Sequence, residues 1–330
     1  MAKADCPGCL KEQTKGYCPG CLGRMFEGKK VSPDLPISKP EYDRMKMRHG
    51  DRVSLPGIRS KHPMKLVDRW LELTDGNGTF LLKPVPNGSF ARSAEIPANE
   101  HVTMQMARQV FDMRVADCAL VFFRDGEPAY LTRRFDRNPD GSKCLQEDFA
   151  QLARRTVETH GRSYKYGYSY EGIADLMREH IGPYAIEAER LLETMIFNFL
   201  VHNGDAHLKD FSLCPLRCQA ISVLTPAYGL INTGLHIQGL KPMALELFKS
   251  KIGHERTDTG SEPGPDDFRA FGIKIGIQEG RVEKILAKFM GRFDRMESLV
   301  SRSYLSESAK MEYLRMVADR VGKLGGPSRL

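Results

Sequence analysis

The chain has 330 residues and a formal net charge of +7, with 41% hydrophobic and 28% charged residues and a pI near 8.9. This composition is that of a folded globular protein, and the length suffices for two lobes with substantial cores. No stretch approaches the roughly 20 apolar residues of a membrane span, and the start "MAKADCPGC" lacks a signal pattern, so we expect a cytoplasmic protein that does not enter membranes. The modest positive charge fits nucleotides or acidic partners, and no long Lys/Arg block supports direct DNA binding.

The first 50 residues are a Cys-rich N-terminal segment followed by a connector. Two Cys-Pro-Gly-Cys knuckles, separated by eight residues, contain Cys6, Cys9, Cys18 and Cys21. Paired knuckles can offer four thiolates to one Zn²⁺ in a tetrahedral site, and Pro-Gly favours the tight turn that aims both sulfurs inward. Such a zinc ion would be structural, because no coordination position stays open. The alternative is four unligated thiols in a small exposed subdomain. Residues 29–50, rich in proline and charge, are predicted to be the connector.

Residues 51–148 have the pattern of a small strand-rich lobe. Short apolar runs such as "RWLELTD", "TFLLKPVP" and "ALVFFRD" are bounded by Gly-Asn-Gly and Asp-Gly turns, as β-strands commonly are. Between these runs we expect an amphipathic helix over 98–113. Its apolar side is formed by Val102, Met106, Val110 and Met113.

Residues 149–330 are dominated by helical patterns and are predicted to form the larger lobe. The clearest patterns run over 146–158, 170–181, 185–201 and 279–302. Strands with one helix, followed by many helices, predict an α+β fold with a strand-rich N-lobe and a larger helical C-lobe. No internal repeat or low-complexity tract is visible.

An apolar helical run over 188–202 ends in the dense polar cluster "NGDAHLKD". The catalytic loop of protein kinases has an Asp that orients the substrate hydroxyl and, five residues later, an Asn that holds Mg²⁺. Asp205 and Asp210 have the same offset. The alternative is a polar turn that simply follows a core helix, and other parts of the chain have to decide between the two.

Phosphoryl transfer also needs a cation on the phosphates, and the N-lobe offers candidates. Lys83 ends the apolar run "GTFLLKP", and Glu100 in the following helix could pair with it as the Lys and Glu of protein kinases pair. Glu100 could equally be a first-turn acidic residue favoured by the helix dipole. The loop over 54–61 contains Gly57 and Lys61 and could cradle phosphate oxygens, although a hairpin turn is the simpler interpretation.

Taken in order, these motifs resemble those of the HipA-like serine/threonine kinases of bacterial toxin–antitoxin systems, over about residues 15–290. The matching motifs are "VSLPGIRSK", "FLLKP", "NEH", "LTRRFDR", "LQEDFAQ", "KYGY", "NGDAHLKDFSL" and "LTPAYGLINT". The resemblance implies a two-lobed protein-kinase-like fold. It also implies transfer of the ATP γ-phosphate, with Mg²⁺, to a Ser or Thr of a protein such as a component of translation.

The resemblance assigns roles residue by residue. Asp205 would orient the substrate hydroxyl and accept its proton, Lys83 would bind the α- and β-phosphates, and Ser54 would be autophosphorylated. The other residues expected at the nucleotide are Gly57 and Lys61 in the ATP loop, Glu147, Asp148 and Phe149 beside the adenine, His207 and Lys209 near the γ-phosphate, and Tyr228 in the metal-binding segment. A phosphate on Ser54 would add a charge of about −2 close to Lys61, which could turn the ATP loop outward.

The chain departs from the family pattern at two metal-binding positions. The catalytic loop of the family ends in Asn where this chain has Asp210, and the metal segment reads Tyr-Asp where this chain has Tyr228-Gly229. Glycine has no side chain to ligate Mg²⁺, but Asp210 restores a negative charge, and Mg²⁺ is often held by one or two carboxylates plus phosphates. We expect Asp210 to be the remaining Mg²⁺ ligand of an active kinase. The alternative is a pseudokinase that binds nucleotide and acts by binding an antitoxin or another partner.

The resemblance also implies protein partners. Only about 50 residues precede Ser54, as in compact members whose missing N-terminal subdomain is a small, separately encoded protein. We therefore expect such a small protein and a DNA-binding antitoxin as partners, with DNA contacted only through the antitoxin. A third hypothesis, a zinc-ribbon nucleic-acid binder with a kinase-like body, rests on the four N-terminal cysteines alone.

Overall fold

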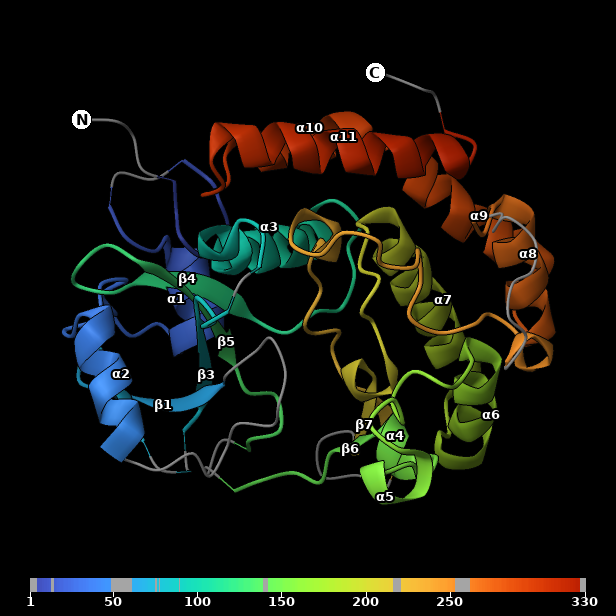
Figure 1. Cartoon of the computed structure of the whole chain (residues 1–330), viewed down its shortest axis with the longest axis horizontal. Helices are drawn as coiled ribbons and strands as arrows, with labels where there is room; N and C mark the ends of the chain where they lie inside the picture. Colours follow the sequence, from blue (N-terminus) through green and yellow to red (C-terminus); the bar gives the residue numbers. More distant parts are fainter. Residues whose placement is uncertain are drawn as a thin grey trace.

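The computed structural model describes residues 5–326 except 13–14, 49–60, 75, 77, 89, 139–141, 216–220 and 253–261. Two lobes lie side by side, the strand-rich one at the left and the helical one at the right of Figure 1. This is the predicted α+β arrangement of a strand-rich N-lobe and a larger helical C-lobe. Among the described residues, no helix is both long and apolar enough to cross a membrane.

A five-stranded antiparallel sheet, in the order β2-β1-β3-β5-β4, is the centre of the N-lobe. Its strands are β1 (His62–Val67), β2 (Trp70–Leu73), β3 (Phe80–Pro84), β4 (Cys118–Phe122) and β5 (Pro128–Arg133). The expected Asp-Gly turn joins β4 to β5, and Gly126 adopts φ +87° there, a conformation that glycine adopts without strain. The Gly-Asn-Gly segment connects β2 to β3, which are not neighbours because β1 lies between them.

Side chains alternate between the two faces of this sheet and so decide what each face packs against. Leu82, Ala119 and Leu131 belong to one buried cluster, which also includes residues of α1 (Pro19–Phe26) and α2 (Lys39–Arg48). Tyr130 belongs to the other cluster, together with residues of α3 (Ile96–Gln109). The sheet is thus covered by α3 on one face and by the N-terminal segment on the other. Lys83 is the register partner of Tyr130 and therefore lies on the α3 face.

Helix α2 is a difference from the predicted connector over 29–50. Pro40 is tolerated because it stands in the first turn, where its missing N–H has no helical partner to lose. The Lys39 ammonium lies 2.8 Å from the Asp43 carboxylate one turn later, and the Lys39 N–H donates to Asp125 in the β4–β5 turn. Fully buried Tyr42 anchors the helix to the lobe, which the high charge of the segment did not indicate.

The C-lobe contains the remaining helices and a small second sheet. The sheet has the order β6-β7-β8, with β6 (Glu147–Asp148), β7 (Ser212–Pro215) and β8 (Ser222–Leu224). The α-helices are α4 (Phe149–Leu152), α5 (Val157–His160), α6 (Tyr170–His180), α7 (Tyr184–Leu200), α8 (Pro265–Lys274), α9 (Glu279–Met290), α10 (Phe293–Ser301) and α11 (Glu307–Lys323). Short 3₁₀ turns are η1 (Ser93–Glu95), η2 (Leu208–Asp210), η3 (Thr233–Leu235) and η4 (Lys249–Lys251).

Two helical predictions need correction. The pattern over 146–158 does not form one helix: it gives β6 and two single-turn helices, because Arg154 adopts φ +52° between them. The pattern over 279–302 is broken at Gly291 and Arg292 into α9 and α10. By contrast, α6 and α7 lie within one residue of the predicted 170–181 and 185–201. Val102, Met106, Val110 and Met113 are all buried, as expected of the apolar side of α3 and its C-terminal end.

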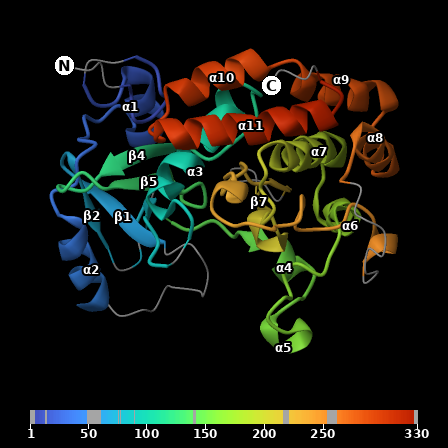
Figure 2. The ribbon, with the colours of Figure 1, turned by 45° about the horizontal axis from the view of Figure 1, so that its top comes forward.

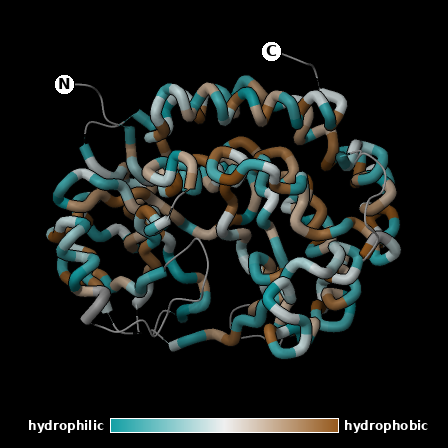
Figure 3. Tube along the Cα trace, viewed as in Figure 1, coloured by the Kyte–Doolittle hydropathy of each residue, from teal (hydrophilic) through white to brown (hydrophobic). Residues whose placement is uncertain are grey.

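The last two helices lie across both lobes. In Figures 1 and 2, α10 and α11 run alongside α3 of the N-lobe and α7 of the C-lobe. Figure 3 shows hydrophilic and hydrophobic residues alternating along this layer, as expected of helices with one buried face. A hydrogen bond between the hydroxyls of Thr103 and Tyr313, 2.9 Å apart, joins α3 to α11 in the core. This layer therefore fixes α3 relative to α7 and the C-lobe.

Candidate active site

The Lys83 ammonium and the Glu100 carboxylate form an ion pair between β3 and α3. Of the two interpretations of Glu100, the kinase-like pairing with Lys83 is therefore the one present. Lys83 is 8% exposed and Glu100 only 2%, and the Lys83 Nζ also lies 5.0 Å from the centroid of the Tyr130 ring. Such a charge can be buried because its partner compensates it. The pair fixes one ammonium at the inner face of the N-lobe sheet.

Candidate catalytic-loop residues 203–210 begin where α7 ends. The Asn203 side chain donates to Oδ1 of Asn198 at 2.8 Å, which anchors the loop to the last turn of the helix. The Gly204 N–H donates to Oγ1 of Thr233 at 2.9 Å. A Cβ on Gly204 would lie 2.3 Å from the carbonyl oxygen of Lys241, so this close approach of two backbones requires glycine. The loop is thus held from both sides before Asp205 is reached.

Asp205 accepts a hydrogen bond from the phenolic hydroxyl of Tyr166 at 2.6 Å. The Tyr166 ring also contacts the edge of His207, with ring centroids 5.3 Å apart. Tyr166 belongs to the "KYGY" motif, so the sequence singled out the segment without assigning the residue a role. A hydroxyl that donates to one carboxylate oxygen orients the carboxylate and leaves the second oxygen to face another group.

Asp210 ends the 3₁₀ turn η2 and is oriented by His207. Its Oδ2 accepts the His207 backbone N–H at 3.1 Å and lies 2.9 Å from the His207 Nδ1. The Asp210 side chain remains 22% exposed. Lys209, between the two, points elsewhere: its Nζ lies 2.9 Å from Oδ2 of Asp148. His207 therefore positions a carboxylate that still reaches solvent.

The Lys209–Asp148 pair joins the catalytic loop to the start of the C-lobe. Burial by itself lowers the pKa of Lys209, but the hydrogen bond and charge of Asp148 outweigh it, and the pKa is raised. Asp148 is also the N-cap of α4 and accepts the Gln151 N–H at 2.9 Å. Glu147 is exposed in β6, whereas the Phe149 ring is fully buried in the core. The Phe149 side chain therefore lies in the core, and only the backbone of this residue lies beside β6.

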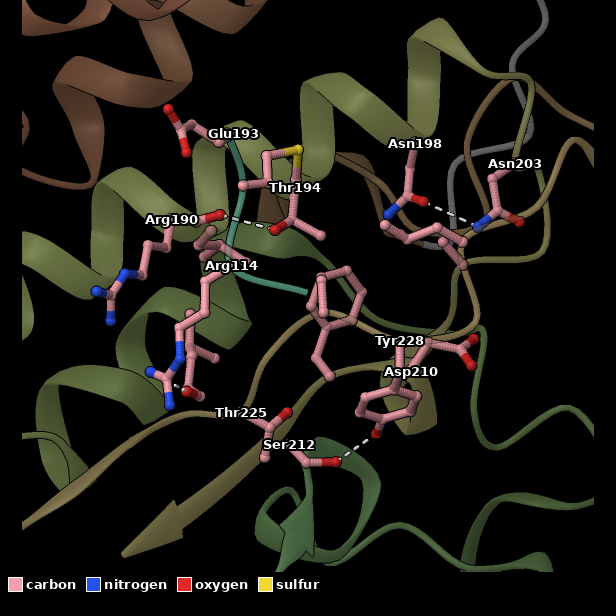
Figure 4. A pocket seen from close by; sticks show the side chains of 17 residues that line it. Arg114, Arg190, Glu193, Thr194, Asn198, Asn203, Asp210, Ser212, Thr225 and Tyr228 are labelled. Atoms are coloured by element: carbon pink, nitrogen blue, oxygen red, sulfur yellow. Dashed lines mark hydrogen bonds between the residues drawn. The ribbon is translucent and has the colours of Figure 1, made fainter. Parts of the chain in front are cut away.

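Tyr228 and Gly229 lie next to the same loop. The Tyr228 hydroxyl donates to the Lys209 carbonyl at 3.0 Å and also contacts the Ser212 hydroxyl, as Figure 4 shows. Burial raises the pKa of Tyr228, so the phenol stays protonated and can act as a donor. Gly229 adopts φ +68°, in the left-handed region where Asp and Asn are the best tolerated alternatives to glycine. An Asp would therefore fit the backbone at this position.

A pocket opens behind these residues, and it is not the expected nucleotide site. Asp210, Ser212 and Tyr228 line one side of it, and Arg190 and Thr194 of α7 line the other (Figure 4). Lys83, Glu147 and Lys209 do not line it. It is a crevice between α7 and the small sheet that reaches Asp210 from the side of the core.

The candidate residues of the ATP loop are only partly described. Ser54 and Gly57 lie outside the described residues, and Lys61 is exposed just before β1. Sequence reasoning missed a further link: Asn99, next to Glu100, donates to the carbonyl of Asn232 at 2.8 Å. No local sequence pattern around Asn99 or Asn232 predicts a contact between residues 133 positions apart. The matching motifs "NEH" and "LTPAYGLINT" contain both and were the available signal.

The four N-terminal cysteines converge. Their Sγ atoms all lie within 4.8 Å of one another, and those of Cys9 and Cys18 are 3.7 Å apart. Cys6, Cys9 and Cys21 are buried and Cys18 is half-buried, so these side chains are packed inside the N-terminal segment and not exposed on it.

Solved structures define the class of fold. The chain superimposes with a TM-score of 0.64 on HipA in the complex of the Shewanella oneidensis toxin–antitoxin proteins HipA and HipB with operator DNA, at 20% identity, covering 88% of this chain and 72% of that one. It superimposes with a TM-score of 0.50 on the Helicobacter pylori proinflammatory kinase CtkA, at 11% identity, covering 79% of this chain and 90% of that one. The protein therefore has the two-lobed, kinase-like α+β fold.

The family follows from the sequence. A family model described as the HipA-like C-terminal domain matches residues 53–297, and the chain belongs to this family. A Haemophilus influenzae protein named "Putative kinase" is 26% identical over 312 residues, which cover 90% of this chain and 89% of the relative. A Sinorhizobium fredii protein, "Putative kinase Y4mE", is 30% identical over 238 residues, covering 70% of this chain and 52% of the relative.

Proposed function

We propose that the protein is an ATP-dependent protein serine/threonine kinase. The observation that carries the proposal is the Lys83–Glu100 pair, 8% and 2% exposed, because it fixes an ammonium of the kind that phosphoryl transfer requires on the phosphates. Lys83 would bind the α- and β-phosphates, and Asp205, oriented by Tyr166, would accept the proton of a substrate Ser or Thr hydroxyl. In this proposal residues 51–148 form the nucleotide-binding lobe and residues 149–330 the catalytic lobe, with β6 at the boundary pairing with β7 of the catalytic lobe.

The residues present fit one carboxylate ligand for Mg²⁺. Asp210 is 22% exposed and held in place by His207, and Mg²⁺ prefers hard oxygen ligands, with phosphates and water completing its shell. Asp210 would hold the ion, which would neutralise charge on the phosphates. Gly229 offers no second side-chain ligand. His207 would serve mainly to position Asp210, and Lys209 would support the adenine side through Asp148.

The remaining nucleotide contacts are proposed from the motifs. Gly57 and Lys61 would lie against the phosphates, and Ser54 would be the autophosphorylated residue. The backbone of 147–149 would face the adenine, since the buried Phe149 ring is engaged in the core. Tyr228 would support this side by holding the Lys209 carbonyl.

The second candidate function is that of a pseudokinase, and Gly229 is the observation in its favour. A kinase that lost one of two metal ligands could retain nucleotide binding through Lys83 while losing several orders of magnitude in rate. Its function would then be to bind a partner.

Partners and location complete the proposal. The S. oneidensis structure contains HipA with HipB and operator DNA. By analogy, this chain would bind a DNA-binding antitoxin, and we place its action in the cytoplasm as part of the same proposal. Its substrate would be a protein, such as a component of translation, and two metals would be involved: exchangeable Mg²⁺ and structural Zn²⁺.

The test is Mg²⁺·ATP binding by calorimetry beside autophosphorylation of the wild type, Asp210→Ala and Gly229→Asp. Phosphate incorporation by the wild type and its loss in Asp210→Ala would support a working kinase that uses Asp210 for the metal. A silent wild type that Gly229→Asp revives would instead establish the pseudokinase. The φ of +68° makes this second substitution compatible with folding.

A further inference from the structure

The four N-terminal sulfurs have the spacing of a tetrahedral metal site. A Zn–S distance of ~2.3 Å in a tetrahedron puts the sulfurs about 3.8 Å apart. The Cys9 and Cys18 sulfurs are 3.7 Å apart, and all four lie within 4.8 Å of one another. The cysteines are free thiols, so no disulfide accounts for their approach. Four buried or half-buried thiols gathered this closely are explained by a shared cation.

Two hydrogen-bond donors lie against the sulfurs. The Cys18 N–H points at the Cys6 Sγ from 3.2 Å, and the Arg24 guanidinium donates to the Cys21 Sγ at 3.3 Å. Both donors stabilise negative charge on sulfur, which a Zn²⁺ with four thiolates leaves in excess. Gly8 is required at its place, because a Cβ there would lie 2.6 Å from the Cys21 Sγ. The backbone of the first Cys-Pro-Gly-Cys knuckle therefore packs directly against the Cys21 sulfur of the second knuckle.

The backbone of the first knuckle is bound to helix α3 and to the sheet. The Gly8 carbonyl lies 3.2 Å from Nε2 of His101, and the Cys9 carbonyl accepts from Nε2 of Gln109 at 2.9 Å. The Pro7 carbonyl accepts the Leu120 N–H of β4 at 2.9 Å. His101 follows Glu100 directly in the middle of α3 and Gln109 is its last residue, so the knuckle contacts the helix beside Glu100 and at its C-terminal end.

We propose that Cys6, Cys9, Cys18 and Cys21 bind one Zn²⁺, and that the resulting knuckle holds α3 so that Glu100 meets Lys83. Zinc is favoured because four thiolates in a tetrahedron suit this ion, and a closed site has no catalytic position. Without the metal, the knuckle loses its crosslink and α3 loses two of its anchors. The consequence for nucleotide binding rests on the function proposed above, whereas the metal site and its effect on α3 do not.

Metal analysis of the full-length wild type, purified without chelators, tests the site. One zinc per chain is expected, with loss of most of it in Cys6→Ser/Cys21→Ser. The matched control is Cys144→Ser, at a half-buried thiol outside the cluster, which should keep its zinc. Iron in place of zinc, or no metal before and after incubation with Zn²⁺, would overturn the proposal. If the double variant does not fold, Co²⁺ substitution of the wild type decides, since tetrahedral thiolate ligation gives intense visible bands.

Hydrogen exchange tests the coupling to α3. Removing zinc from the wild type should speed exchange of the amides of 102–109 by about tenfold or more, because local opening of the helix becomes easier. Exchange in α6 serves as the internal reference. Unchanged α3 exchange in zinc-free, folded protein would show that the knuckle does not hold the helix. ATP binding, measured on the same samples, separates the two proposals: zinc-dependent α3 protection without any ATP binding refutes the kinase and leaves the metal site standing.

Discussion

Asn99 and Asn232 exchange two hydrogen bonds between α3 and the segment that follows Gly229. The Asn99 Nδ2 donates to the Asn232 carbonyl at 2.8 Å, and the Asn232 N–H donates to the Asn99 Oδ1 at 3.2 Å. Since Glu100 is the next residue of the same helix, α3 holds both Lys83 and the candidate metal-binding segment. Helix α3 is therefore one of the elements that connect the two lobes.

Asn99→Ala should destabilise the protein and reduce activity together. Asn99 is fully buried, and its loss leaves the Asn232 N–H and carbonyl without these partners, at a cost of about 2–4 kcal/mol. Urea unfolding and phosphate incorporation measure the two effects. Thr103→Ser, on the same helix, keeps the hydroxyl that donates to Asn99 and bonds Tyr313, leaves the Asn99–Asn232 pair in place, and should retain activity. Equal loss of activity in both variants would contradict the role of the pair.

Removing one charge of the Lys83–Glu100 pair should lower the free energy of unfolding more than removing both charges. Lys83→Met leaves a carboxylate that is 2% exposed without its ion-pair partner, which costs roughly 3–5 kcal/mol. Lys83→Met/Glu100→Met removes both charges and should recover most of that free energy of unfolding, while ATP binding stays lost. A double-mutant cycle from urea unfolding gives the coupling. Additive losses would mean that the pair contributes little to the fold.

The sequence predicted those parts of the site that depend on local order. The kinase analogy offered a pair between Lys83 in a strand and Glu100 in the helix that follows, as one of two alternatives, and the ion pair is present. The Tyr166–Asp205 and Asn99–Asn232 contacts join residues 39 and 133 positions apart, and only the tertiary fold brings them together.

The errors in secondary structure have a similar origin. The helical pattern over 146–158 gave way to β6 because Glu147 and Asp148 pair with β7, a strand some sixty residues later. Asp148 then caps α4 and binds Lys209 as well. The spacing of apolar residues within one segment cannot predict pairing with a strand so far along the chain, and this tertiary pairing overrides the local helical pattern.

Tyr166→Phe should lower the rate without unfolding the protein. The substitution removes only the hydroxyl that donates to Asp205, so the carboxylate loses its orientation while the ring keeps its contact with His207. We expect kcat to fall by about tenfold, compared with 10²- to 10⁴-fold for Asp205→Asn. Tyr168→Phe, whose ring packs on the Arg155 guanidinium, is the matched control and should keep the wild-type rate. A full rate for Tyr166→Phe would exclude a positioning role.

His202 should make the stability of the fold fall between neutral and mildly acidic pH. Burial, together with the positive charge of Arg320, lowers the pKa of His202 to about 4, and the nearby carboxylates Asp319 and Glu262 only partly offset this. Between the ordinary pKa of about 6.5 and about 4, the unfolded chain binds a proton that the folded chain does not, so stability is present above this window and is lost as the pH falls through it, by up to about 1.4 kcal/mol per pH unit.

Unfolding by urea at several pH values from 7 to 4.5 measures this contribution. His202→Asn is the appropriate variant, because His202 adopts φ +52° and Asn tolerates that backbone conformation. Its free energy of unfolding should be lower at pH 7 but should decline less steeply with acid than that of the wild type. His160→Gln, at an exposed histidine, should follow the wild-type curve. Parallel curves for His202→Asn and the wild type would show that another group carries the pH dependence.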